Sequence, residues 1–184
     1  MSTGKIQVYY GEERGKTSAA LGYAIHEASK GESVIVIQFL KQKDEDEISF
    51  LGRLEPEIRL FRFQKSEKFY RELPAEEQLE EQMNMKNGIN YARKVLQTGE
   101  CDILILDEPT RGIDIGTKTE IQKLVLDLAD QGMAVAFISS EVEEMLRTCS
   151  RMAVLRDGEK VGELEESELS QANIMKAIAG GDEK

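Results

Sequence analysis

The sequence has no tryptophan, two cysteines, three prolines and one histidine among 184 residues. Two cysteines without metal-site spacing argue against a zinc framework built on thiolates. We expect Cys101 and Cys149 to be ordinary thiols of a reducing compartment, although the sequence leaves a disulfide between them open. The single His26 falls on an expected helix, and we interpret it as a surface or packing residue rather than a metal ligand.

Positive charge is scarce as well, since 24 lysines and arginines face 35 aspartates and glutamates, a net charge of −11. This excess of acid argues against a protein that holds nucleic acid through phosphate contacts. No apolar run has the length of a membrane span, and the N-terminus lacks the apolar core of a signal peptide. We therefore expect a cytoplasmic protein of one domain, residues 1–184, with neither a nucleic-acid partner nor a membrane span.

The most informative stretch is Gly11-Glu12-Glu13-Arg14-Gly15-Lys16-Thr17-Ser18, between an expected strand at 5–10 and an expected helix at 17–30. A glycine-containing loop in this position directs backbone N–H groups and the positive end of the helix at an anion. The pattern predicts a nucleotide-phosphate site, with Thr17 also a ligand of Mg²⁺. The residues predicted to bind the nucleotide are Gly11, Arg14, Gly15, Lys16, Thr17 and Ser18.

Two features of this loop are unusual. Gly11 and Gly15 enclose three residues where four are usual, and Glu12 and Glu13 place carboxylates where phosphates would lie. A unit charge about 5 Å away costs about 3 kcal/mol at an effective dielectric near 20, and less if the side chain turns toward water. The acids favour weak over tight binding. A plain turn at a helix start stays open as the alternative.

A second anchor is the stretch Asp102-Ile103-Leu104-Ile105-Leu106-Asp107-Glu108, an apolar run followed by two acids. This pattern is typical of a Walker B strand, which holds two acids rigidly at its carboxyl end. Asp107 is predicted to belong to the Mg²⁺ shell. Glu108 is predicted to complete that shell or to polarise a water as the catalytic base. The alternative is an ordinary strand end.

Strands and helices are expected to alternate along the chain. The strands are predicted at 5–10, 33–40, 58–63, 102–107, 133–140, 151–156 and 160–164, and the helices at 17–30, 48–54, 74–98, 117–131, 141–148 and 170–179. Alternation of this kind indicates an α/β fold with a mainly parallel central sheet between two helical layers. Both anchors follow strands, and ligands of such sheets bind at the carboxyl ends of the strands.

Three local expectations concern the middle of the chain. Helix 74–98 should bury a stripe formed by Leu79, Met83, residues 89–92 and Leu96. The strand at 58–63 alternates apolar and basic residues, so its arginines should lie on a solvated face, with phosphate contact as the alternative. Residues 65–73 form a polar connector, which the sequence leaves open as a lid or a partner contact.

From about 4 to 106 the chain resembles the ATP:corrinoid adenosyltransferases. The resemblance lies in 7–11, Arg14-Gly15-Lys16-Thr17-Ser18-Ala19-Ala20-Leu21-Gly22 and Val36-Ile37-Gln38-Phe39-Leu40-Lys41. It implies transfer of the adenosyl group of ATP to a cob(I)alamin-type corrinoid, with triphosphate as the other product. It also implies that Gly11, Gly15, Lys16 and Thr17 hold the triphosphate and that Glu108 helps hold the metal. That family shares the short loop, but usually has glycine where this chain has Glu13.

From about 103 to 181 the chain resembles the ATPase subunits of sugar ABC transporters. The resemblance lies in Leu106-Asp107-Glu108-Pro109-Thr110-Arg111-Gly112-Ile113-Asp114, Phe137-Ile138-Ser139-Ser140-Glu141 and 152–158. It implies that Glu108 is the general base and Asp114 the D-loop acid. Ser140 replaces the switch histidine, and the serine-glycine-glycine signature and the glutamine loop are absent from the sequence. The transporter cycle should therefore not run.

Both resemblances include the strand at 102–108, which points to a P-loop NTPase fold, RecA-like and ABC-like, with a seam there. An engineered chimera and a natural divergent protein both fit. The shared core predicts the order 151–156, 5–10, 133–140, 102–107 and 33–40 across the sheet. The first functional hypothesis is an ATP-binding domain with weak or no turnover. The alternatives are a scaffold that ignores ATP, a corrinoid adenosyltransferase and an ABC-type ATPase; a homodimer stays open.

Overall fold

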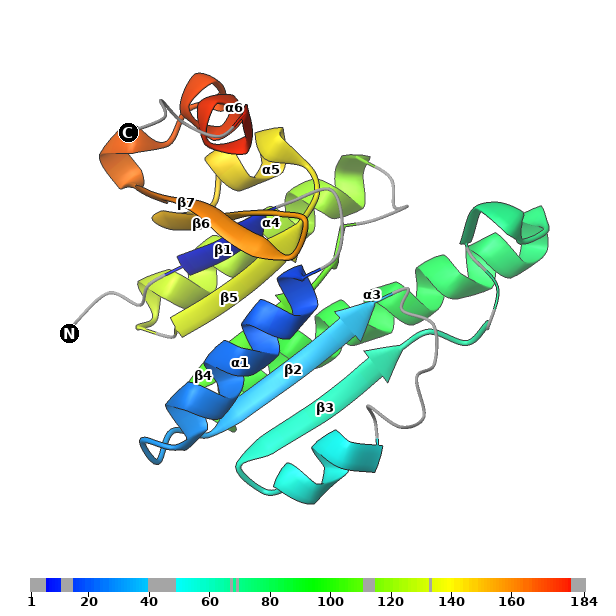
Figure 1. Cartoon of the computed structure of the whole chain (residues 1–184). Coiled ribbons are helices and arrows are strands. Elements are labelled where there is room, and N and C mark those ends of the chain that lie inside the picture. Colours follow the sequence, from blue (N-terminus) through cyan, green and yellow to red (C-terminus); the bar gives the residue numbers. More distant parts are fainter. Residues whose placement is uncertain are drawn as a thin grey trace.

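The computed structural model describes residues 6–10, 15–39, 49–66, 68, 70–110, 115–132 and 134–179. Within these residues the strands form one seven-stranded sheet in the order β3-β2-β4-β5-β1-β6-β7. The strands are β1 (Ile6–Tyr10), β2 (Val34–Phe39), β3 (Ile58–Phe63), β4 (Ile103–Asp107), β5 (Ala134–Ser139), β6 (Arg151–Arg156) and β7 (Glu159–Glu165). This arrangement confirms the predicted order of the inner five strands, with β3 added beyond β2 and β7 beyond β6 (Figure 1).

Every pairing in the sheet is parallel except that of β6 with β7. The antiparallel pair is a hairpin whose turn uses Asp157 at φ 53° and Gly158 at φ 83°. Positive φ at both central residues is what a two-residue hairpin turn requires, and Asp-Gly is a favoured pair there. The sheet is therefore mainly parallel, as the sequence predicted.

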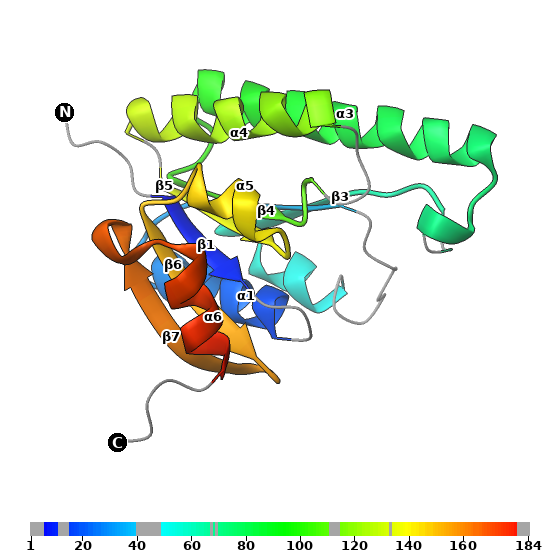
Figure 2. The ribbon, with the colours of Figure 1, turned by 90° about the horizontal axis from the view of Figure 1, so that it is seen from above.

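Helices cover both faces of the sheet, so the fold has three layers (Figure 2). The helices are α1 (Lys16–Ala28), α3 (Ala75–Thr98), α4 (Ile115–Asp130), α5 (Val142–Leu146) and α6 (Gln171–Ala179). One core cluster joins the sheet to α3, α4, α5 and α6, and the other joins the opposite face to Ala20 and Ala24 of α1. The crossover helices between parallel strands explain why the central strands are buried on both faces.

The central strands are mostly apolar because neither face of the sheet meets water there. All the side chains of β2 and β4 are buried. On α4, the side chains of Ile121, Leu124, Val125 and Leu128 are all buried against the sheet. Cys101 and Cys149 are buried free thiols, so no disulfide joins them. His26 is exposed on α1, as expected.

The stripe predicted on α3 is wrong at its beginning. Leu79 is 61% exposed and Met83 is 68% exposed, whereas Met85 is 1% exposed. Successive residues of a helix are about 100° apart, so Met83 and Met85 lie on nearly opposite sides. The first half of α3 also extends past the end of the sheet (Figure 1). The side chain of Leu96 lies outside the description.

The arginines of β3 do not lie on a solvated face, contrary to the preferred prediction. Arg59 Nη2 donates a hydrogen bond to the Glu100 carbonyl at 2.8 Å, and Arg62 Nε donates to Gln38 Oε1 at 2.7 Å. Both side chains are half-buried. β3 is an edge strand, but each guanidinium reaches an acceptor on a neighbouring element, which the alternating pattern alone could not reveal.

Candidate functional site

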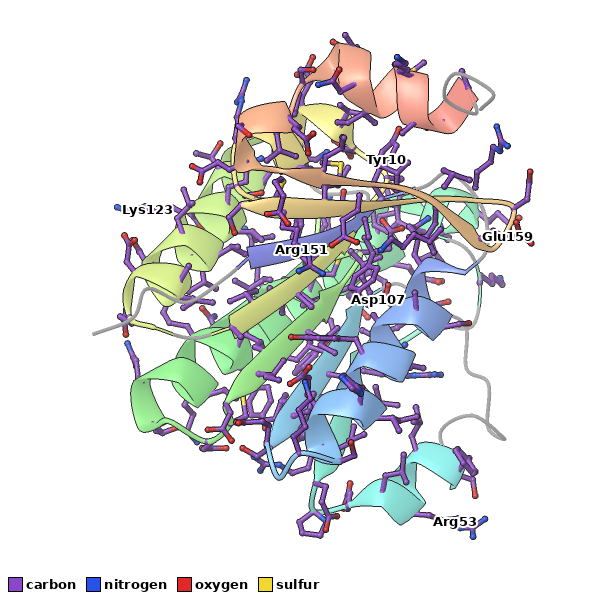
Figure 3. The ribbon with its side chains drawn as sticks, turned by 60° about the vertical axis from the view of Figure 1, so that its left-hand side comes forward. Tyr10, Arg53, Asp107, Lys123, Arg151 and Glu159 are labelled. Carbon is purple, nitrogen blue, oxygen red and sulfur yellow. The ribbon has the colours of Figure 1, made fainter. Side chains whose placement is uncertain are left out.

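The two anchors meet at the carboxyl edge of the sheet. Thr17, in the first turn of α1, donates its hydroxyl to Asp107 Oδ2 at 2.9 Å, although the two residues are 90 positions apart. Lys16 Nζ lies 3.6 Å from Glu108 Oε1. Strands β1 and β4 both flank β5 and run parallel to it, which places their carboxyl ends at one edge. Figure 3 shows Asp107 there, close to the start of α1.

Gly15 enters α1 with a backbone that other residues rarely adopt. Its φ is 107°, and a Cβ built on it would lie 2.7 Å from Cα of Gly158. A side chain at this position would therefore strain the backbone and clash with the tip of the β6–β7 hairpin. Gly158, at the tip of the hairpin, therefore packs against Gly15, the last glycine of the phosphate loop. Sequence reasoning missed this contact, because nothing in the pattern relates Gly158 to the loop.

Lys16 and Glu108 form a pair that is largely screened from water. Lys16 is 7% exposed and Glu108 is 8% exposed. Glu108 adopts φ 56°, and its backbone N–H donates to the Ile138 carbonyl at 2.9 Å on β5. A non-glycine residue at positive φ costs of order 1–3 kcal/mol, and such strain clusters at functional sites. The hydrogen bond to β5 holds the strained residue where the chain leaves β4.

Gln38 belongs to the site although the sequence analysis did not single it out. It is fully buried, and its Nε2 donates to Asp107 Oδ2 at 3.2 Å. Its Oε1 accepts the hydrogen bond from Arg62 Nε. The signal that could have revealed it is an amide alone in the apolar run Val34-Ile35-Val36-Ile37-Gln38-Phe39, because a buried amide needs partners.

The segment that follows Glu108 is anchored by a second buried acid. Thr110 is 1% exposed, and Glu144 of α5 is 5% exposed with its Oε1 3.1 Å from Lys118 Nζ. Burial raises the pKa of the Glu144 carboxyl, while hydrogen bonds from Thr110 and Lys118 act in the opposite direction. Thr110, which follows β4, and Lys118 of α4 thus both contact the carboxyl group of Glu144.

Some predicted site residues are not placed by the structure or face elsewhere. Gly11, Glu12, Glu13, Arg14 and Asp114 lie outside the described residues. The side chain of Ser18 is exposed on the first turn of α1. The structure thus brings together Gly15, Lys16, Thr17, Asp107 and Glu108.

The donor set at this edge suits a hard cation. The hydroxyl of Thr17 and the carboxylates of Asp107 and Glu108 supply oxygen, which Mg²⁺ prefers. No group of three or more histidine, cysteine, aspartate or glutamate side chains forms a metal cage among the described residues. That also fits Mg²⁺, which is usually held by one or two carboxylates together with waters and substrate phosphates. The described residues therefore fit a magnesium ion that arrives with a phosphate ligand.

Comparison with known proteins identifies the family. The family model described as ATP:corrinoid adenosyltransferase BtuR/CobO/CobP matches residues 2–140. The chain belongs to the ATP:corrinoid adenosyltransferase family. The match contains both anchors, and it ends later than residue 106, where the motifs had placed the end of the resemblance.

The chain also resembles ATP-binding proteins of sugar importers, so both predicted resemblances are confirmed. It is 58% identical over 79 residues to the fructose import ATP-binding protein FruK of Bifidobacterium longum, covering 42% of this chain and 15% of that protein. It is 48% identical over 80 residues to the ribose import ATP-binding protein RbsA of Rhodococcus jostii, covering 44% of this chain and 16% of that protein. The chain thus spans about a sixth of the length of these relatives.

Solved structures confirm the fold. An ABC transporter in an inward-facing conformation superposes with a TM-score of 0.58 at 15% identity, covering 96% of this chain and 79% of that chain. A KaiC-like protein from Pyrococcus horikoshii superposes with a TM-score of 0.56 at 18% identity, covering 84% of this chain and 71% of that chain. The α/β P-loop fold predicted from the sequence is therefore correct. In the described part of the chain, no helix combines the length and apolar character needed to cross a membrane.

Proposed function

We propose that this chain is a nucleotide-binding P-loop domain that takes ATP with Mg²⁺ and turns it over weakly or not at all. The observation that carries the proposal is the hydrogen bond from Thr17 to Asp107, which joins the two anchors at one place. In this reading Gly15, Lys16 and the start of α1 bind the phosphates. Thr17, Asp107 and Glu108 hold Mg²⁺, which neutralises charge on the phosphate oxygens when it is bound.

The pair formed by Lys16 and Glu108 supports weak binding. At 3.6 Å the carboxylate compensates the lysine charge without a ligand, so phosphate must compete with Glu108 for the same ammonium group. Glu108 is in turn paired with that lysine. A phosphate that draws Lys16 away would release Glu108 to act as a base or to approach the metal.

We further propose that the chain is an engineered chimera of the two families that it resembles. In this proposal residues 1–184 form one domain. The topology supports a seam at 102–108. Strand β4 pairs with β2 on one side and with β5 on the other, so it joins the two parts of the sheet. Strand β1 lies between β5 and β6, so the N-terminal part supplies one strand to the half of the sheet that the C-terminal part forms. An exchange at the shared β4 strand preserves this order.

A second candidate function is corrinoid adenosyl transfer, favoured by the family match over residues 2–140. The reaction would move the adenosyl group of ATP to a cob(I)alamin-type corrinoid, with triphosphate as the other product. The corrinoid would then be a partner of the chain besides the nucleotide. An ABC-type ATPase, with Glu108 as the base, is a third candidate because of the likeness to the sugar importers.

Calorimetric titration of Mg-ATP tests the proposal. Binding heat is expected for the wild-type protein and for Lys30→Ala, a control on the exposed end of α1 where Lys30 pairs with Glu27. Lys16→Ala should abolish it. Absence of heat up to millimolar ATP in all three proteins would refute nucleotide binding and leave a scaffold. If ATP binds, triphosphate release with cob(I)alamin would indicate the transferase, and phosphate release that Glu108→Gln abolishes would indicate the ATPase.

A further inference from the structure

Three polar side chains form a row across the sheet beside the candidate site. In the strand register Gln38 of β2 is opposite Arg62 of β3 on one side and opposite Asp107 of β4 on the other. Residues in register on neighbouring strands point to the same face of a sheet. The row therefore runs from the edge strand to the carboxyl end of β4, on the face that α1 covers.

The hydrogen bonds along the row all have the same direction. Arg62 Nε donates to Gln38 Oε1 at 2.7 Å, and Gln38 Nε2 donates to Asp107 Oδ2 at 3.2 Å. A guanidinium can only donate, so it fixes which end of the amide faces β3 and turns the NH₂ group toward the carboxylate. The positive charge also polarises the amide and strengthens its donation to Asp107.

Asp107 is thus held from two sides. Its Oδ2 accepts from Gln38 within the sheet and from the Thr17 hydroxyl at the start of α1, at 2.9 Å. Two donors from different elements fix where the carboxylate lies relative to the phosphate loop. Thr17 and Asp107 are residues that would hold Mg²⁺, and because this ion demands near-ideal octahedral geometry its binding would depend on where their oxygens are placed.

We propose that Gln38 and Arg62 are positioning residues that orient the Asp107 carboxylate for the Mg²⁺ of bound Mg-ATP. The inference rests on the proposed function and adds two residues, neither of which belongs to a phosphate-loop or Walker pattern. Partners behind a metal ligand typically contribute 10- to 100-fold in metal affinity. Removing the amide should therefore weaken the metal and leave the phosphate contacts of the loop in place.

The experiment separates metal binding from phosphate binding. The ATP affinity is measured by calorimetry across a range of Mg²⁺ concentrations and again in EDTA, for wild type, Gln38→Met and Arg62→Met. Gln38→Met keeps the volume of the buried side chain but removes both hydrogen bonds. We expect it to lower the apparent Mg²⁺ affinity 10- to 100-fold with little change in ATP affinity in EDTA. Arg62→Met should act in the same direction with a smaller effect.

Two controls address a purely structural role. Arg59→Met removes another guanidinium of β3, which contacts Glu100 rather than Gln38, and it should leave Mg²⁺ affinity unchanged. Arg62→Lys retains a donor and should recover part of the loss. Circular dichroism establishes that each variant is folded, and Arg62→Met carries the test if Gln38→Met does not fold.

The outcomes distinguish a failure of Mg-ATP binding from a failure of the positioning role of Gln38 and Arg62. A wild-type protein that binds no Mg-ATP would refute the proposed function and this inference with it. A wild-type protein that binds Mg-ATP, with variants whose Mg²⁺ affinity is unchanged, would refute the inference alone. Equal losses with Mg²⁺ and in EDTA would also refute it, because they would indicate a general disturbance of the loop.

Discussion

Gly88 lies where α3 meets two phenylalanine rings, and adding one methyl group there should destabilise the fold. A Cβ on Gly88 would be 2.5 Å from Phe39 Cε1, 2.7 Å from Phe63 Cγ and 2.8 Å from Phe63 Cδ2. The rings stack with centroids 6.1 Å apart, and Phe39 is 1% exposed, so its ring has no open space to move into. Forcing extra volume into a packed core typically costs about 1–3 kcal/mol.

The matched control is Gly22, in the middle of α1, where an added Cβ would meet nothing within 4 Å. Alanine gains about 0.5–1 kcal/mol over glycine inside a helix, and this gain is common to both substitutions. Gly22→Ala should therefore stabilise the protein by about that amount. The difference between the two variants isolates the packing cost in α3, which should be about 1–3 kcal/mol.

Urea unfolding followed by circular dichroism measures this difference, provided that the two variants have the same m-value. In a thermal scan the two midpoints should differ by about 2–4 °C for each kcal/mol in a protein of this size. Equal stability of Gly88→Ala and Gly22→Ala would refute the argument. It would mean that the rings of Phe39 and Phe63 move aside at no cost.

Three further predictions concern titratable groups. Burial raises the pKa of the Cys149 thiol to about 12 and that of Cys101 to about 11. Both thiols should therefore react slowly with a thiol reagent at pH 8 in the native protein and promptly in urea. A fast reaction of the native protein would contradict the burial of the two thiols. Hydrogen bonds from Ser33 lower the pKa of Asp102, so its contribution to stability is present above the unfolded pKa of about 3.9 and is lost as pH falls through the folded value. Ser33→Ala should move the Asp102 titration, followed by NMR, back toward its ordinary range; an unmoved titration would show that Ser33 is not the cause. Glu108→Gln should tighten the binding of ATP measured by calorimetry in EDTA, because it removes the carboxylate that competes for the phosphate-loop lysine, and weaker binding in EDTA would count against that competition.

Local sequence patterns were sufficient to predict the two segments that meet at the candidate site. Gly15, Lys16 and Thr17 were identified because a glycine loop before a helix binds anions, and Asp107 and Glu108 because two acids follow a buried strand. Both signals arise from neighbouring residues, whose geometry depends on local backbone conformation. Their meeting was predicted as well, since parallel strands place their carboxyl ends at one edge.

The same reasoning failed where a side chain's surroundings come from distant parts of the chain. Leu79 and Met83 fit a helical stripe, yet they are exposed because they lie on the side of α3 opposite to the buried Met85. Arg62 fits a solvated edge, yet it donates to an amide on β2. Helical periodicity describes one element at a time, and it contains no information on where the neighbouring element ends.

The α/β class and the acidic strand end could be predicted from the sequence, as could a glycine loop before a helix, because these depend on short-range backbone chemistry and on the apolar character of central strands. That Gln38 and Arg62 stand in register with Asp107, and that Gly158 packs against Gly15, emerged only from the folded chain. Those contacts join residues that are 24 to 143 positions apart. Strand register and hairpin placement set such distances, and both are properties of the assembled sheet.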